Sequence, residues 1–471
     1  MTPPCRVLLI SVNRCTDPDP VFPLGLAHIN AALRTAGHET RWLDRLSNLD
    51  RLAETLVEFK PDLVGIGVRN IDDVLIRQQE KFYDELAPVM ATIRQHSRAP
   101  VVLGGSGFSI FPQQLLTLTN ADYGIAGEGE PGILALLAAL KNGGDLAGIP
   151  GLIHRRNGII AMNPAAFDPL ELPLTEADRP TEIAQTYLKA SATLNLQTQR
   201  GCHYLCCYCT YPVIEGKTNR QRPPDVVAAE LESLQRQGAR FVFIVDSVFN
   251  STPRHVEEIC EAILRRGVKI SWGCFLRPRG LTADLMDLMA RAGLTHIEFG
   301  TDSFSDTTLE AYAKHFTFAD VLAASELARG RKLDYCHFLI CGGPGETEAT
   351  LNEAFQNSLQ LKSTVILAVV GMRIYPGTPL FDRAVAEGVI RPGADLLAPV
   401  YYVAPGLTAD LVFARLKEFA RRSPAWIAGD PLPGYRELVQ RLRQRGVAGP
   451  LWSYLSVVQR LWQPVPNPAA K

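Results

Sequence analysis

The sequence predicts an α/β protein built from two parallel-sheet domains, and three observations lead to this fold class. Short apolar runs alternate with helical segments through residues 1–150, glycines follow several of these runs, and the alternation restarts near residue 190. Strands that alternate with helices form parallel sheets. Residues 1–150 are therefore expected to form a doubly wound, flavodoxin- or Rossmann-like sheet. Residues 190–398, with six strand–helix units, are expected to form a partial (β/α)6 barrel of the TIM type.

The composition is typical of a globular chain without a strong overall charge. The chain has 471 residues, 46% of them hydrophobic, which is enough for about three domains. With 48 basic and 49 acidic side chains the net charge is -1, so no global field favours nucleic acid or an anionic membrane. No apolar run approaches the ~18 residues of a membrane span, and ten cysteines without an export signal indicate a reducing compartment. A cytoplasmic protein is expected.

Within residues 1–150, an apolar run at 6–12 predicts the first strand and residues 25–37 predict a helix that ends at glycine. Further strands are expected at 40–44, 62–68 and 100–103, with helices near 52–59 and before 96. Ligands of such sheets bind beyond the carboxyl ends of the strands. Glycine at these ends lets a large ligand approach the backbone, although the same glycines could equally form tight turns.

From residue 190 the strands are expected at 192–197, 241–246, 270–275, 296–300, 335–340 and 366–372. Barrel active sites form at the carboxyl ends of strands, which places Asp246, Arg277 and Glu298 beside one cavity. Residues 151–189, rich in proline and acidic side chains, are expected to be a linker. Residues 399–471, with Trp426, Trp452 and Trp462, are expected to be a small helical cap that could close over the barrel mouth.

The most specific pattern is C-x3-C-x2-C, formed by Cys202, Cys206 and Cys209 just after a predicted strand. Three thiolates in one short loop indicate an iron–sulfur cluster. Three ligands would leave one iron of a [4Fe–4S] cluster open to bind a small molecule, which implies catalysis. A zinc site would more often use paired C-x2-C knuckles or Cys/His mixtures, and a disulfide framework belongs to small secreted chains.

This motif, with Tyr208 as the aromatic residue before its last cysteine, resembles that of the radical S-adenosylmethionine (radical SAM) family. The resemblance implies a [4Fe–4S] cluster whose open iron binds S-adenosylmethionine, and an electron donor such as flavodoxin or ferredoxin. It places the S-adenosylmethionine contacts at Tyr208, Asp246, Arg277, Glu298 and Gly300. Lys217, Arg220 and Arg222 follow the motif and could stabilise a reduced cluster, although a solvated loop is the simpler interpretation.

The run at 22–27 and the glycines at 104–105 and 127–129 resemble the cobalamin-binding domain that precedes the radical SAM domain in one large subgroup. The Asp-x-His-x-x-Gly motif, whose histidine coordinates cobalt in the best-known cobalamin domains, is not in this sequence. The resemblance implies cobalamin contacts at Leu24, Gly25, Arg69, Asn70, Gly104, Gly105, Ser106, Gly107, Gly127, Glu128 and Gly129.

Residues 68–70 resemble the tryptophan 2-methyltransferase branch, in which an arginine lies below the metal. Arginine stays protonated and does not readily ligate a metal, so Arg69 would disfavour a lower ligand. The alternative is that Arg69 pairs with Asp72 or Asp73 at the surface.

Taken together, these resemblances imply methyl transfer from S-adenosylmethionine, by way of methylcobalamin, to an unactivated carbon or phosphorus of a small molecule. The alternatives are methyl transfer without a 5′-deoxyadenosyl radical, a cobalamin-containing cyclase or rearranging enzyme, and a non-catalytic iron–sulfur or cobalamin sensor. No second set of cluster cysteines lies near residue 471, which favours a small metabolite over a large peptide.

Overall fold

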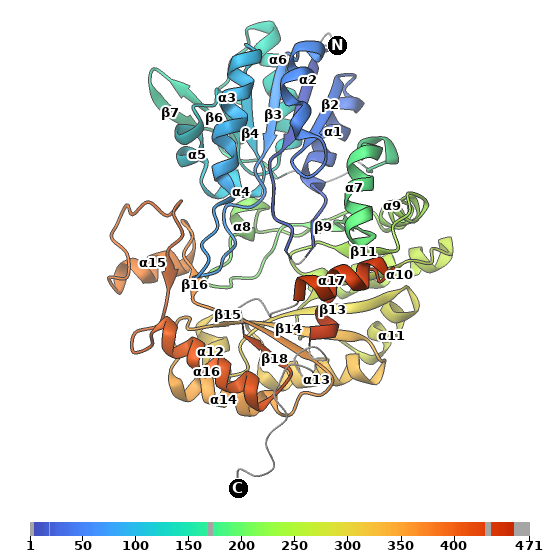
Figure 1. Ribbon diagram of the computed structural model, residues 1–471, viewed down its shortest axis with the longest axis vertical. Coiled ribbons are helices and arrows are strands. Elements are labelled where there is room, and N and C mark those ends of the chain that lie inside the picture. The colour runs from blue at the N-terminus through green and yellow to red at the C-terminus, as the bar shows by residue number, and fades with distance from the viewer. Residues whose placement is uncertain (1–3, 18, 168–172, 429–434, 456–471) are drawn as a thin grey trace.

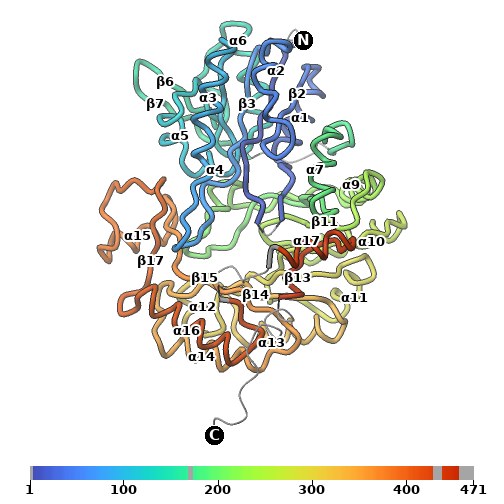
Figure 2. The backbone as a smooth tube through the Cα atoms, in the orientation of Figure 1, coloured from blue at the N-terminus to red at the C-terminus, as the bar shows by residue number. Residues whose placement is uncertain are grey.

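The structure is a computed structural model that describes residues 4–17, 19–167, 173–428 and 435–455. Figure 1 shows two lobes, each built on a seven-stranded sheet, with the first 160 residues forming the upper lobe. The chain trace in Figure 2 passes from the upper to the lower lobe through the segment around helix α7 (Thr181–Ser191). No helix among the described residues is both long and apolar enough to cross a membrane. The predicted α/β fold class is confirmed.

The N-terminal sheet has the order β2-β1-β3-β4-β5-β6-β7. Its first five strands are parallel, as predicted. Alternate residues of β1 enter two cores: Val7 and Leu9 pack with one helical layer, and Leu8 and Ile10 pack with the other. Both faces of a parallel sheet are covered in this way.

The strands are β1 (Arg6–Ser11), β2 (Glu39–Asp44), β3 (Leu63–Gly67), β4 (Val101–Gly104) and β5 (Tyr123–Ile125). The helices are α1 (Leu24–Thr35), α2 (Leu52–Phe59), α3 (Leu86–His96), α4 (Ser106–Ile110), α5 (Pro112–Thr119) and α6 (Gly129–Asn142).

The N-terminal sheet continues past residue 150 into the segment that the sequence predicts as a linker. β6 (Leu152–Arg156) and β7 (Ile159–Met162) form an antiparallel hairpin on β5. Its turn is Asn157-Gly158, with φ of +52° and +79°. Asn-Gly between two apolar runs is a strong hairpin signal. The many prolines and acidic residues that follow it in the sequence favoured the prediction of a linker instead.

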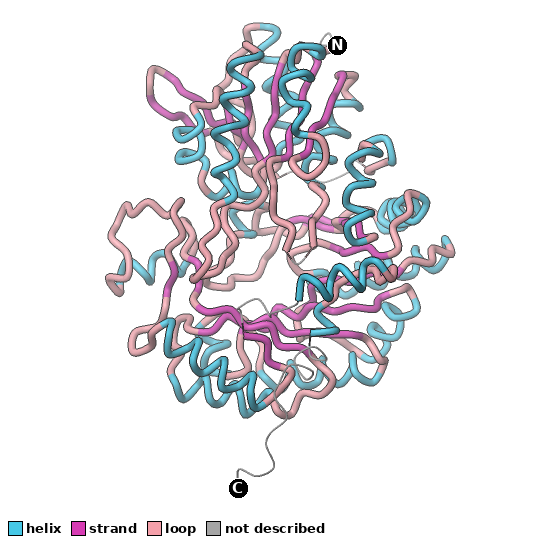
Figure 3. Tube along the Cα trace, viewed as in Figure 1, coloured by secondary structure: helices cyan, strands magenta, loops and turns pink. Residues whose placement is uncertain are grey.

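The second sheet has the order β18-β15-β14-β13-β12-β11-β8, and every neighbouring pair is parallel. Six of these strands confirm the predicted partial barrel, and Figure 3 shows its helices on the outer side. The barrel strands are β8 (Thr193–Leu196), β11 (Phe241–Ile244), β12 (Ser271–Leu276), β13 (Leu294–Asp302), β14 (Asp334–Cys341), β15 (Val365–Val370) and β18 (Trp426–Ala428). The main helices are α9 (Pro224–Arg236), α10 (Pro253–Arg266), α11 (Ala283–Arg291), α12 (Asp306–Ala311), α13 (Phe318–Gly330), α14 (Glu348–Ser358) and α16 (Ala409–Arg422). Shorter elements are α8 (Tyr211–Ile214), α15 (Pro379–Ala386), α17 (Tyr435–Gln444), β9 (Gln199–Arg200), β10 (Arg220–Gln221), β16 (Met372–Arg373) and β17 (Tyr401–Tyr402).

The C-terminal region differs from the expected cap in two ways. Part of it, β18, is the seventh strand of the barrel sheet rather than helix. Trp452 packs with Cys336 and Val365, which lie near the amino ends of β14 and β15. The described residues around Trp452 therefore fill the amino end of the barrel rather than its mouth, because their buried apolar side chains cover this layer of the core. Trp462 lies outside the described residues.

Buried polar contacts fix the two lobes against each other. Asn195 Nδ2 at the barrel's first strand donates to the Phe22 carbonyl at 2.8 Å. Asp72 of the upper lobe pairs with Arg373 of the lower lobe, with 2.9 Å between Nε and Oδ2, and both side chains are almost fully buried. These contacts hold the loops at the carboxyl ends of both sheets face to face.

Candidate active site between the two sheets

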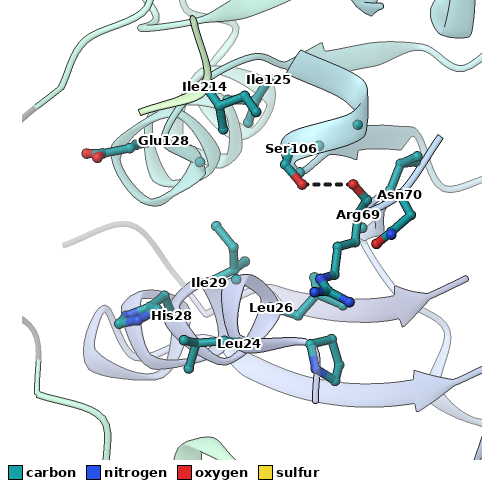
Figure 4. Close-up of a pocket in the computed structure, with 18 of the residues that line it drawn as sticks. Leu24, Leu26, His28, Ile29, Arg69, Asn70, Ser106, Ile125, Glu128 and Ile214 are labelled. Atoms are coloured by element: carbon teal, nitrogen blue, oxygen red, sulfur yellow. Dashed lines mark hydrogen bonds between the residues drawn. The ribbon is translucent and has the colours of Figure 1, made fainter. Parts of the chain in front are cut away.

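A cavity of about 630 Å³ lies where the two lobes meet. It opens at the carboxyl ends of β1, β3 and β4, where the strand order reverses, which is where doubly wound sheets bind their ligands. All eleven residues expected to contact cobalamin line this one cavity, and Figure 4 shows several of them around its walls. They are Leu24, Gly25, Arg69, Asn70, Gly104, Gly105, Ser106, Gly107, Gly127, Glu128 and Gly129.

Glycines form part of the cavity wall for two different reasons. Gly105 has a φ of +99°, and a Cβ there would stand 2.6 Å from the Val68 carbonyl oxygen, so the backbone itself requires glycine. Gly25 is exposed at the cavity, and a Cβ there would meet no atom within 4 Å, so a side chain would project into the cavity space. This bare backbone leaves room for a large, flat ligand such as a corrinoid ring and lets its amide side chains approach the peptide groups.

Arg69 is the cationic side chain that extends from the loop after β3 into the cavity, away from Ser106 (Figure 4). Its carbonyl accepts the Ser106 hydroxyl at 2.8 Å, which fixes its backbone. The surface pairing that the sequence left open does not form: Asp72 pairs with Arg373, and the Asp73 carboxylate accepts a backbone N–H within its own loop. The guanidinium is therefore available to a ligand in the cavity.

The opposite wall comes from the residues that directly follow the last motif cysteine. Thr210, Tyr211, Ile214 and Glu215, at and beside the short helix α8, all line the same cavity. Because Thr210 is bonded to Cys209, the loop that carries the three thiols and the glycine-rich cavity share a wall. Two ligands bound at these places would be neighbours.

Charged contacts join the cavity loop to the cysteine loop. Glu128 pairs with Arg220 at 2.5 Å and with Arg200 at 3.6 Å, and Glu130 pairs with Arg200 at 2.8 Å. Arg200 directly precedes Gly201, whose φ of +88° and close approach to Thr218 require glycine. Glu128, expected at the cobalamin, thus also holds the start of the cysteine loop.

The three motif cysteines are carried by an irregular loop after β9, and all are free thiols. Cys202 is buried, while Cys206 and Cys209 are half-buried. The described residues contain no group of three or more His, Cys, Asp or Glu side chains gathered closely enough to hold a metal ion. Burial raises the pKa of Cys209 to about 12, so cluster binding must release its proton.

The expected S-adenosylmethionine residues fall into two groups. Tyr208, Arg277 and Gly300 lie at or near the carboxyl side of the barrel, and a Cβ at Gly300 would meet no atom within 4 Å. Arg277 stacks over Tyr204 of the cysteine loop, with 3.7 Å from its guanidinium carbon to the ring centroid. A ligand contact at Tyr208, Arg277 and Gly300 stays a prediction.

Asp246 and Glu298 are engaged elsewhere. The fully buried Asp246 carboxylate accepts the Thr198 backbone N–H at 2.6 Å and the Gln199 N–H at 3.3 Å, so it anchors the segment that leads into the cysteine loop. Glu298 lies in the middle of β13 and accepts Trp452 Nε1 at 3.0 Å, inside the lower barrel. Burial raises the pKa of each carboxyl to about 7.

Two of the basic residues that follow the motif have different environments. Lys217 is exposed, in agreement with the simpler interpretation of a solvated loop, whereas Arg222 forms a buried pair with Glu230 at 2.6 Å, which neither interpretation expected. Besides Arg277, a second buried cation near the cysteine loop is Lys314, in the loop after α12, and no local sequence pattern indicates it.

Known proteins resemble both halves of this arrangement. The radical SAM superfamily family model matches residues 196–357, and the B12 binding domain model matches residues 11–137. Tryptophan 2-C-methyltransferase from Streptomyces laurentii is 26% identical over 437 residues, covering 79% of this chain and 73% of that protein. Among solved structures, radical S-adenosylmethionine methyltransferase TsrM from Kitasatospora setae, with tryptophan substrate and a SAM analogue bound, aligns with a TM-score of 0.86 and 25% identity over 97% of this chain and 98% of that one. The same protein with cobalamin and a [4Fe–4S] cluster aligns with a TM-score of 0.84 at 23% identity, covering 97% of this chain and 99% of that one. The chain is therefore a radical SAM enzyme, in which residues 196–357 match the radical SAM superfamily model and residues 11–137, in front of the barrel, match the B12 binding domain model.

Proposed function

We propose that this enzyme transfers a methyl group from S-adenosylmethionine, by way of cobalamin, to a carbon atom of a small metabolite. The observation that carries the proposal is the shared wall: Thr210 and Tyr211, next to the last motif cysteine, line the cavity of the upper lobe. A methyl carrier and the site that binds its donor are adjacent in such an arrangement, and the substrate can lie between them.

Each cofactor has a set of residues that fits it. Cys202, Cys206 and Cys209 would hold a [4Fe–4S] cluster with one open iron, and the glycine-rich cavity would hold cobalamin. When bound, these groups supply the reductive activation of S-adenosylmethionine and the methyl-carrying metal. The chain itself aligns the two sites and excludes water.

Arg69 is assigned to the lower side of the corrinoid. His28 also borders the cavity, but it is only 1% exposed and its Nε2 has no accessible surface, so it cannot reach a ligand. A guanidinium stays protonated and does not readily ligate a metal, so Arg69 leaves that side without a protein ligand. Loss of a lower ligand should ease methyl transfer to and from cobalt.

The proposed partners are a small-molecule substrate and a low-potential electron donor such as flavodoxin or ferredoxin. Tryptophan is the first substrate to test, because it is the substrate named for the relative and the structure described above. If tryptophan is not methylated, other small aromatic metabolites are the next substrates to test.

Transfer of labelled methyl tests the proposal. The anaerobically prepared enzyme is incubated with trideuteromethyl S-adenosylmethionine, a reductant and tryptophan, and products are analysed by mass spectrometry. A product that carries the labelled methyl supports the proposal, and 5′-deoxyadenosine in the same mixture decides whether a radical is formed. 5′-Deoxyadenosine with no methylated product across a panel of aromatic metabolites would favour a cyclase or rearranging enzyme instead.

The matched control is a pair of neighbouring cysteines. Cys206→Ala removes a motif thiol and should abolish methyl transfer. Cys207→Ala removes the adjacent thiol, an intervening residue of the motif and not one of its three cluster cysteines, and should leave most of the activity. Equal activity of the two variants would contradict the assignment of the cluster.

A further inference from the structure

The loop after β3 reaches from the upper lobe down to β16 in the lower lobe (Figure 1). Two contacts fix it there, one on each side of Val74. Asp72 pairs with Arg373 of β16. Ile76 lies against Gly371, where an added Cβ would stand 3.2 Å from Ile76 Cδ1. Val74 is therefore held on the side of the cavity that faces the lower lobe.

Val74 has a backbone conformation that its own side chain disfavours. Its φ is +52°, a left-handed value that is a genuine outlier for a β-branched residue. Asp72 holds this conformation, because one of its carboxylate oxygens accepts the Val74 N–H at 3.0 Å and the other is fixed by Arg373 Nε at 2.9 Å. Such conformations persist only where the surrounding structure over-determines them, and they are concentrated at active sites and ligand clamps.

The Val74 side chain is only partly covered by the protein. It is apolar and yet 46% exposed, and it lines the cavity between the lobes. Apolar surface is stabilised when a ligand removes it from water. A strained valine that presents its side chain to a cavity therefore points to a ligand contact rather than to a role in packing.

The lower lobe supplies a second cavity-lining side chain, Tyr375, from the turn after β16. Its ring is fixed by two neighbours: the Arg373 guanidinium carbon lies 4.9 Å from its centroid, and the centroid of the Phe111 ring lies 6.2 Å away. Arg373 thus contacts Tyr375 directly and positions Val74 through Asp72. One buried ion pair places both side chains at the same cavity.

We propose that Val74 is a specificity-determining residue of this enzyme, and that its side chain and the Tyr375 ring contact a flat, apolar ring of the substrate. The glycines assigned to the corrinoid lie at the strand ends of the upper sheet, whereas Val74 and Tyr375 are anchored at the lower lobe. A substrate would lie there, between the corrinoid and the cysteine loop. The inference rests on the proposed function in that the substrate binds in this cavity.

The test measures binding rather than turnover. The holoenzyme, loaded with cluster and cobalamin, is titrated with tryptophan and with a panel of other aromatic metabolites, and dissociation constants are measured by isothermal titration calorimetry. Val74→Gly removes the side chain and readily adopts the positive φ, so the affinity for the best ligand should fall at least about tenfold while the melting temperature does not fall. Val74→Thr keeps the shape and the branching but adds a hydroxyl to the wall, and it should lower the affinity at least about threefold.

Gln79 provides the matched control in the same loop. It is also a non-glycine residue with a φ of +52°, but it is exposed and does not line the cavity. Gln79→Gly makes the same backbone change and should leave the affinity within about twofold of the wild type. Tyr375→Ala should lower the affinity at least about tenfold, and Tyr375→Phe, which keeps the ring, should lose less.

Equal affinities of the wild type and Val74→Gly would overturn the proposal. A melting temperature that falls together with the affinity would also overturn it, because Val74 would then only support the loop, and so would a holoenzyme that binds no aromatic metabolite of the panel. Binding that depends on Val74, without transfer of labelled methyl to any bound metabolite, would leave the inference standing and refute the proposed function.

Discussion

Breaking the buried ion pair between Asp72 and Arg373 should destabilise the contact that holds the two lobes together. The two side chains are 0% and 3% exposed, and their residues are 301 positions apart in the sequence. At a separation of about 4 Å and an effective dielectric of about 20, such a pair interacts with about 4 kcal/mol. Removing one partner leaves a buried, unpaired charge, and losses of about 3–5 kcal/mol are typical.

We therefore expect Asp72→Ala to lower the free energy of unfolding by about 3–5 kcal/mol, a large part of the 5–15 kcal/mol typical of a folded protein. Urea unfolding followed by circular dichroism measures this change. The double variant Asp72→Ala with Arg373→Met should lose less than the sum of the two single variants, by at least about 2 kcal/mol, because neither charge is then left alone. Arg373 also donates to the Leu396 carbonyl at 2.7 Å, so Arg373→Met alone should be costly.

A double-mutant cycle in which the two single losses add to within about 0.5 kcal/mol would refute this reasoning. Asp410→Ala provides the control, since the Asp410 side chain is 91% exposed and its pair with Arg77 lies at the surface. That change should cost no more than about 1 kcal/mol.

Three further predictions concern the cavity and the barrel core. Gly105→Ala should lower stability by roughly 1–3 kcal/mol and reduce bound corrinoid, because of the positive φ and the contact with Val68; equal corrinoid content and an unchanged melting temperature would contradict this. Arg69→Ala should leave the iron content unchanged while it lowers methyl transfer at least about tenfold, measured as labelled product; full activity would remove Arg69 from the site. Glu298 has a pKa raised by burial to about 7, so its contribution to stability is fully present below its unfolded pKa and is lost as the pH rises through about 7. Glu298→Gln should therefore be more stable than the wild type at pH 8, because the amide oxygen of glutamine can still accept the Trp452 N–H and carries no charge. Urea unfolding of both proteins between pH 5 and pH 8 measures the difference. If the free energies of unfolding of the two proteins change with pH in parallel, the Glu298 carboxyl does not titrate near pH 7.

The features that could be predicted from the sequence are those coded by neighbouring residues. The cysteine spacing with Tyr208 is local, and the glycines at 104–107 follow their strand directly, so both were visible as patterns. Parallel-sheet topology then brings strand ends together at one edge, which is why all eleven expected cobalamin residues line the same cavity.

The features that were missed depend on contacts between distant residues. Tyr208 and Asp302 are 94 positions apart, and no local pattern identifies Lys314 as their partner. Glu298 and Trp452 are 154 positions apart, so the closure of the amino end of the barrel was not visible in the sequence. The hairpin at Asn157-Gly158 is different, because its turn signal was present and was outweighed by the composition around it.

The measurement that tests the account most directly is the cofactor content of the chain. The protein is expressed anaerobically with cobalamin supplied, and bound corrinoid and iron are measured by absorbance and metal analysis. The account predicts about one corrinoid and four irons per chain, with the iron lost in Cys206→Ala and retained in Cys207→Ala. Four irons without corrinoid, despite available cobalamin, would contradict the assignment of the cavity and with it the proposed route of the methyl group.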